Sequence, residues 1–244
     1  QAPGAKRRAA GGKRRARDRR RRAPAILPSR MSRHRPLAIL LAALALGGCG
    51  TVGDDRPQVD ATLVLAGPPQ ATDAPLAAAI ERGYDGAEGV NLTLRKPRGA
   101  APAAGVRALK ARRADFAVVD VATLGAEREL VGVMALVNAP DGDRAPLVVL
   151  ATTRRRLEED PSVAKAAVAA ILRGYEQTQV DPQSSLSDLQ AQFDGLDRNG
   201  LEARLAAAQE QLFPPGRQLG ALPLNDPRFD TSVVPAAVAT THDS

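Results

Sequence analysis

The chain has 244 residues, of which 2% are aromatic, one is Cys and two are His. A single Cys excludes an internal disulfide framework and a multi-Cys zinc site, and His34 and His242 lie too near the ends for a His-based triad in the middle of the chain. The net charge of +7 divides unevenly: residues 1–48 hold 14 Lys and Arg against one acid, Asp18, whereas residues 49–244 hold 20 basic and 26 acidic residues. An acidic body with few aromatic residues argues against nucleic-acid binding by that body.

Residues 1–30 form a basic stretch without hydrophobic periodicity, and we expect them to be disordered. One interpretation is a basic arm for nucleic acid. The interpretation we favour is that these residues do not belong to the working protein, because the first Met is Met31 and a complete export signal follows it.

Residues 31–48 have the three parts of an export signal. Arg33, His34 and Arg35 form a basic region, and an apolar run from Leu37 to Leu46 follows, which is too short to span a bilayer unaided. Gly47-Gly48-Cys49 then offers small residues before a cleavage point. As an alternative role, Cys49 is a small buried hydrophobe, but it lies between glycines and before a polar stretch.

The order of these parts, ending at Cys49, resembles the lipobox of bacterial lipoproteins. The resemblance implies cleavage between Gly48 and Cys49, acylation of Cys49, and anchoring on the outer face of the cytoplasmic membrane through buried acyl chains. Residues 49–60 are then the tether of a protein that runs from Cys49 to Ser244 outside the cytoplasm.

The body alternates short apolar runs with helical patterns. Asp73 is expected to cap the first helix, with Pro75 in its first turn and Gly83 after its end. Such alternation predicts a parallel sheet covered by helices. Strands are expected at 62–66, 91–95, 115–120 and 130–137, and helices at 73–80, 102–113 and 121–128.

After a fifth strand at 146–152 the pattern becomes helical. Asp160-Pro161 and Asp181-Pro182 are pairs typical of a cap followed by the first helical residue. They predict helices from 161 to about 179 and from 182 to 193, and a third helix is expected over 198–212. Residues 214–244 are expected to be an irregular tail, loose at its end.

Several modest motifs stand in a particular order along the body. They are Pro69-Gln70 after the first strand, RGY at 82–84, GVNL at 89–92, LKARRADFA at 109–117, LVGVMALVN at 130–138, the PLVVLATTRRR run at 146–156 and RGY at 173–175. Between about Ala61 and Phe213 this order resembles the solute-binding proteins of bacterial ABC importers, of the sulfonate, nitrate and thiamine-pyrimidine-precursor type.

The resemblance implies a two-lobed α/β clamp with the solute between the lobes, at the carboxyl ends of strands. A second lobe of domain size is expected between the strand ending near Asn138 and the strand starting near Leu147, but only residues 139–146 lie there. We therefore expect a periplasmic-binding-protein-like α/β domain over 61–213 with a helical C-terminal part, lacking most of its second lobe.

The resemblance also implies which residues contact the solute: Pro69, Gln70, Asp73, Asp120, Thr123 and Asn138. Several of them have structural alternatives. Asp73 and Asp120 suit helix caps, Gln70 suits turn hydrogen bonds, and Asn138 suits the closing of a linker. Some thiamine-precursor relatives are enzymes that use His and Cys, but Asp73 stands where such members often have His and the one Cys lies in the signal.

The sequence therefore predicts a lipid-anchored extracytoplasmic protein that delivers a small solute to an ABC permease and its ATPase. We expect no catalytic residue, no cofactor, no metal ligand and no nucleic-acid partner. The alternative function is that of an envelope lipoprotein that binds a protein partner without transport.

Overall fold

A computed structural model describes residues 58–99, 103–140 and 146–235. All of them belong to one compact unit, 52–244. Met31, Gly48, Cys49 and most of the expected tether lie outside the described residues. The first strand begins at Val59, inside the stretch that was expected to be tether.

One five-stranded sheet organises the described residues, in the order β2-β1-β3-β5-β4. Its strands are β1 (Val59–Val64), β2 (Val90–Arg95), β3 (Phe116–Asp120), β4 (Leu130–Asn138) and β5 (Pro146–Thr153). β1 runs parallel to β2 and β3, whereas β5 is antiparallel to both β3 and β4, so β4 runs in the direction of the first three strands. The α/β class and the mostly parallel sheet are thus confirmed; the insertion of β5 between β3 and β4 was not predicted.

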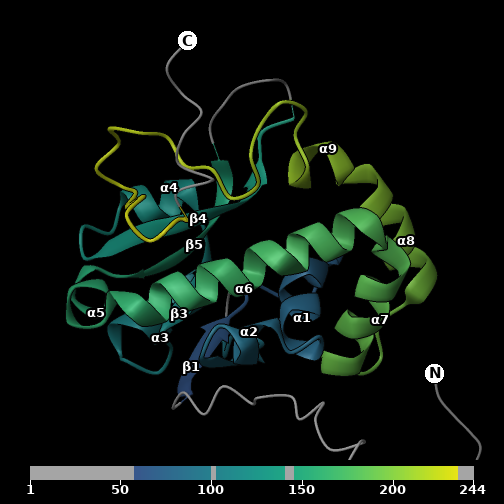
Figure 1. Ribbon diagram of the computed structural model, residues 1–244, viewed down its shortest axis with the longest axis horizontal. Helices are drawn as coiled ribbons and strands as arrows, with labels where there is room; N and C mark the ends of the chain where they lie inside the picture. The colour runs from purple at the N-terminus through teal and green to yellow at the C-terminus, as the bar shows by residue number, and fades with distance from the viewer. Residues whose placement is uncertain (1–57, 100–102, 141–145, 236–244) are drawn as a thin grey trace, which may run out of the picture. The chain divides into compact units, whose positions relative to one another are not determined.

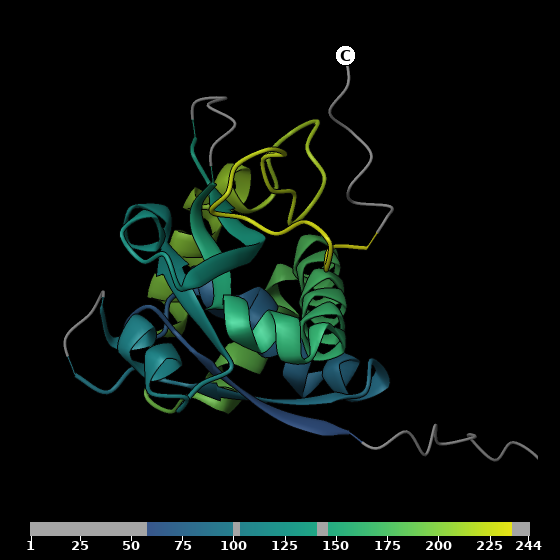
Figure 2. The ribbon, with the colours of Figure 1, turned by 90° about the vertical axis from the view of Figure 1, so that its left-hand side faces the viewer.

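The two faces of the sheet carry separate apolar clusters because side chains alternate along each strand. In β3, Phe116 and Val118 belong to one cluster and Ala117 and Val119 to the other. On the first face, α6 (Pro161–Val180) packs against β2, β4 and α1 (Ala74–Glu81), and α7 (Pro182–Gln192) packs against α1 and α6. The second face is covered by α3 (Ala103–Lys110) and α4 (Val121–Gly125). Figures 1 and 2 show the sheet between α6 and these shorter helices.

Small residues let α1 and α6 approach closely. A Cβ atom placed on Gly174 of α6 would lie 2.1 Å from the Pro75 carbonyl oxygen and 3.0 Å from the Ala79 Cβ. Beside this contact, Tyr175 is buried and its hydroxyl donates to the Leu136 carbonyl of β4 at 2.6 Å. These contacts fix α6 across the sheet.

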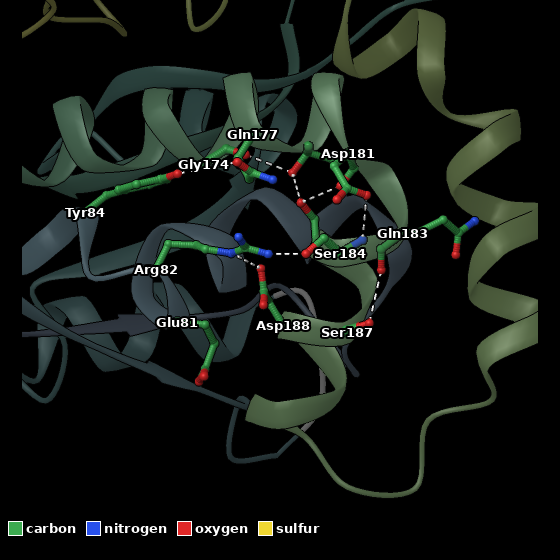
Figure 3. A network of polar contacts seen from close by, with 12 residues as sticks. Glu81, Arg82, Tyr84, Gly174, Gln177, Asp181, Gln183, Ser184, Ser187 and Asp188 are labelled. Carbon is green, nitrogen blue, oxygen red and sulfur yellow. Dashed lines mark hydrogen bonds and ion pairs between the residues drawn. The ribbon is translucent and has the colours of Figure 1, made fainter.

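Polar side chains at the end of α1 bond to α7 (Figure 3). Arg82 Nε donates to Asp188 Oδ2 at 3.0 Å, and its Nη2 also donates to the hydroxyl of Ser184. Asp181 Oδ1 accepts the Ser184 N–H at 3.0 Å, which makes it the side-chain cap of α7. Side-chain pairs thereby tie together helices that lie far apart in the sequence.

The C-terminal helices begin near their expected residues, with two differences. Asp160 precedes α6 but makes no side-chain cap bond, and its Oδ1 accepts the Ser162 hydroxyl instead. The helix expected over 198–212 is divided at Ala208 into α8 (Arg198–Ala207) and α9 (Gln209–Leu212). Asp197 caps α8 by accepting the Gly200 N–H.

The remaining short helices are η1 (Ala71–Asp73), α2 (Tyr84–Ala87) and α5 (Arg154–Glu159).

The described part of the tail is irregular, as expected, but it packs on the sheet. Gly132 of β4 donates its N–H to Arg228 O and accepts the Asp230 N–H, forming a bridge beside the buried Phe229. β4 is the last strand of the sheet, so the tail covers an edge that would otherwise present unpaired backbone groups.

Candidate functional site

The predicted solute contacts come from loops that follow three strands. β1, β3 and β4 run in one direction, so their carboxyl ends lie at one edge of the sheet. Ligands of open α/β sheets bind outside such an edge. Pro69 and Gln70 follow β1, Asp120 and Thr123 follow β3, and Asn138 ends β4. β5 separates the ends of β3 and β4.

The loop after β1 divides its polar groups between solvent and interior. Gln70 is exposed and Pro69 half-buried, whereas Asp73 is buried. Asp73 does not cap α1 as predicted; its Oδ2 accepts the Gln70 N–H at 2.8 Å, which closes the turn into η1. Burial raises the pKa of Asp73 to about 6, although the Gln70 N–H acts in the opposite direction.

Asp120 and Thr123 form the cap of α4. Asp120 Oδ1 accepts the Thr123 N–H and its Oδ2 accepts the Thr123 hydroxyl, both at 2.7 Å. Partial burial would raise the pKa of Asp120, but these hydrogen bonds prevail and hold it below its usual value. Both side chains are half-buried. The cap therefore engages the carboxylate within its own loop and leaves an anionic group near the edge.

Asn138 is buried and joins β4 to the C-terminal segment. Its Nδ2 donates to the Gln211 carbonyl at 3.2 Å, and its Oδ1 accepts from Arg217 Nη1 at 3.1 Å. Asn138 also pairs with Pro146, so the last residue of β4 lies beside the first residue of the antiparallel β5. α9 packs on β4 and α8 packs on η1, and the chain's own helices therefore occupy this end of the edge.

Sequence reasoning missed a cationic cavity at the carboxyl ends of β1 and β2. It measures about 270 Å³ and is lined by Val64, Arg95, Lys96, Arg98, Ala104, Ala108 and Arg113. The signal was visible as Arg95-Lys96-Pro97-Arg98 directly after the second strand. The contribution of Arg113 depends on how α3 folds back, which no local pattern shows.

A second cavity of about 690 Å³ lies among the amino ends of β3 and β4 and the start of α5, and its charges are mixed. Arg156 is paired with Asp115 at 3.2 Å and Arg155 with Glu159 at 3.3 Å. Within the described ranges no group of three or more His, Cys, Asp and Glu side chains is placed to hold a metal ion. In the same part of the chain no helix has the length and apolar character needed to cross a membrane.

No family model matches the chain, and neither does any curated protein. Solved structures do match. One is a protein of Bordetella bronchiseptica RB50, at 12% identity and a TM-score of 0.56, over 72% of this chain and 96% of that one. This likeness shows a shared fold.

Two further neighbours are similar at lower TM-scores. The alkanesulfonate-binding protein of Xanthomonas axonopodis pv. citri, solved with MOPS, matches at 10% identity and 0.48, over 62% of this chain and 85% of that chain. A Candida albicans protein described as having the generic periplasmic binding protein fold matches at 11% and 0.45, over 60% and 79%. These three neighbours are 10–12% identical to this chain.

Proposed function

We propose that this protein is a solute-binding component of a bacterial ABC importer, reduced to one lobe and its helical C-terminal part. It is exported, anchored through acylated Cys49 on the outer face of the cytoplasmic membrane, and delivers a small organic solute to a permease with its ATPase. The observation that carries the proposal is that the motif-bearing loops, Pro69-Gln70 and Asp120 to Thr123, follow two adjacent parallel strands, β1 and β3. Ligands of open α/β sheets bind outside the carboxyl ends of such strands.

The proposal assigns unequal roles to the six residues inferred from the motifs. Gln70, Pro69 and Thr123 are at least partly open to solvent and would contact the solute directly. Asp120 would accept a hydrogen bond from the solute through the oxygen lone pairs that the α4 cap does not use. Asp73 and Asn138 are buried and bonded within the protein, so they would position the loops that carry the contacts. The role is binding without chemistry, with no cofactor.

The test of solute binding is a thermal melt of the full chain against pyrimidines, sulfonates, nitrate and amino acids. A ligand present at 100 times its Kd stabilises the native state by about 2.7 kcal/mol, which raises Tm by roughly 5–10 °C for a domain of this size. The double variant Gln70→Ala/Thr123→Ala should lose the shift. Gln179→Ala, which removes an exposed Gln from α6, should keep it.

A cooperative melt that no solute shifts would contradict the proposal and favour the other function, docking on an envelope protein. The anchor is tested separately by fractionating cells that express the protein. We expect wild-type protein in the membrane fraction with an acylated N-terminus by mass spectrometry, and soluble or unprocessed protein for Cys49→Ala. Membrane retention of Cys49→Ala without acylation would refute anchoring through this residue.

A further inference from the structure

The cavity at the ends of β1 and β2 is lined by four cations, Arg95, Lys96, Arg98 and Arg113, and by no carboxylate among the residues that the structure describes. Residues 49–244 carry a net charge of −6, so a purely cationic lining stands out against its surroundings. Three small or branched apolar side chains complete the lining. They are Val64, Ala104 and Ala108.

These cations are not neutralised by the fold. In the described ranges, Arg95, Arg98 and Arg113 make no side-chain hydrogen bond or ion pair, and Lys96 Nζ lies 5.2 Å from the centre of the Phe193 ring. The arginines of the larger cavity provide the contrast, since Arg155 and Arg156 are paired with acids there. Like charges gathered in one place repel one another, and an anion would relieve that repulsion.

The volume of the cavity and the chemistry of its lining restrict the class of ligand that it can bind. About 270 Å³ lies just below the range of roughly 300–1,000 Å³ typical of drug-sized ligands. Guanidinium groups present parallel N–H donors that match the oxygens of phosphate-like anions, which makes Arg the residue of choice for such groups. The parallel pairing of Val64 with Arg95 places the cavity at the carboxyl ends of adjacent strands.

We infer that this cavity binds a small tetrahedral oxyanion of the phosphate or sulfate class, either free or as the headgroup of an anionic lipid. The guanidinium groups of Arg95, Arg98 and Arg113 hold the oxygens, Lys96 supplies additional positive charge, and the apolar wall accommodates a short carbon chain attached to the anion. The cavity lies at the same edge of the sheet as the loops of the proposed function, but none of the six residues named there lines it, so the two sites can be tested separately.

The test compares variants of the full chain, so that the basic residues 1–48 are the same in every sample. Inorganic phosphate and sulfate are titrated by calorimetry at low ionic strength, and vesicles of phosphatidylcholine with or without phosphatidylglycerol are tested by flotation. We expect Arg95→Glu/Arg98→Glu to weaken the binding of at least one of these anions tenfold or more. Arg204→Glu removes an exposed Arg from α8 and should leave it unchanged.

The calorimetry and the vesicle flotation together identify the source of the anion. Loss of phosphate or sulfate binding indicates a free solute, and loss of phosphatidylglycerol binding alone indicates a lipid headgroup; either supports the site. Equal binding by wild type, Arg95→Glu/Arg98→Glu and Arg204→Glu to every anion overturns it. Arg113→Gln, which keeps the side chain polar and adds no acid, should also weaken binding, and melts without anion show that each variant is folded. If a solute raises the Tm of the wild type while all variants bind the anions equally, the anion site is overturned and the proposed solute-binding function stands.

Discussion

On the α6 face of the sheet, polar side chains bond to one another across helix interfaces, whereas at the carboxyl ends of β1 and β2 the cations face a cavity. Arg82 is held by Asp188 and Ser184, and Tyr175 by the Leu136 carbonyl. Arg95 and Arg98 have no such partners among the described residues. The difference teaches that polar groups on the α6 face maintain the fold, whereas the cations beside α3 stay available to a ligand because no acid of the described residues pairs with them.

The largest expected effect comes from separating α1 and α6. Gly174→Ala would place a Cβ 2.1 Å from the Pro75 carbonyl oxygen, so the helices must move apart. We expect a loss of about 3 kcal/mol or more in the free energy of unfolding, measured with urea. Gly67→Ala is the control, because a Cβ there meets nothing within 4 Å. Equal stability of the two variants would mean that the α6 face is not closely packed.

Asp73 should make the stability of the folded protein depend on pH. Burial raises its pKa to about 6, above the usual 3.8, so the folded state prefers the protonated carboxyl. The stability that this proton contributes is complete below about pH 4 and is lost as the pH rises through 6, about 2–3 kcal/mol in all. Asp73→Asn should therefore be more stable than wild type at pH 7.5 and equal to it at pH 4. Parallel pH profiles of Tm for the two proteins would contradict this.

Tyr175 tests a single hydrogen bond on the α6 face. Burial, followed by the charge of Asp73, raises the pKa of Tyr175 above its usual value, so the hydroxyl stays protonated and donates to Leu136 O. Tyr175→Phe leaves that carbonyl without its donor, and we expect a loss of about 1–2 kcal/mol in urea unfolding. In the matched variant Tyr84→Phe the lost contact, to Gln177, is 3.5 Å long and only part-buried. Its effect should be close to zero, and an equal loss in both variants would count against the Tyr175 bond.

The smallest effect on stability is expected at Asp120, at the carboxyl edge of the sheet. Asp120→Ala removes both bonds of the α4 cap and should lower stability by about 1 kcal/mol, whereas Asp120→Asn keeps one acceptor and should lose less. Thermal melts in the presence of a bound solute then separate the two roles of Asp120. If Asp120→Asn still melts cooperatively but no longer shows the solute shift, Asp120 contacts the solute. If the shift is retained in Asp120→Asn, Asp120 acts only as a cap.

Much of the fold could be predicted because its signals are local. Apolar runs located the five strands, and Asp181-Pro182 marked the start of α7. The cap at Asp120 was one of two roles weighed from the sequence, and its hydrogen bonds are present. Two cap predictions failed because a neighbouring donor binds the carboxylate in place of the N–H of the following helix. Asp73 accepts an N–H from the preceding turn instead of from α1, and Asp160 bonds to Ser162, so neither makes the expected side-chain cap.

The sequence by itself determined the alternation of strands and helices and the order of the motifs, because periodicity, caps and turns act over a few residues. Only the tertiary structure decided that β5 is inserted antiparallel between β3 and β4, that Asn138 bonds to Arg217, 79 residues away, and that Arg113 joins Arg95 and Arg98 around one cavity. The physical reason is that strand order and long-range polar contacts depend on how distant segments pack together. The residues predicted to contact the solute follow β1 and β3 or end β4, and packing decided which of their side chains are exposed.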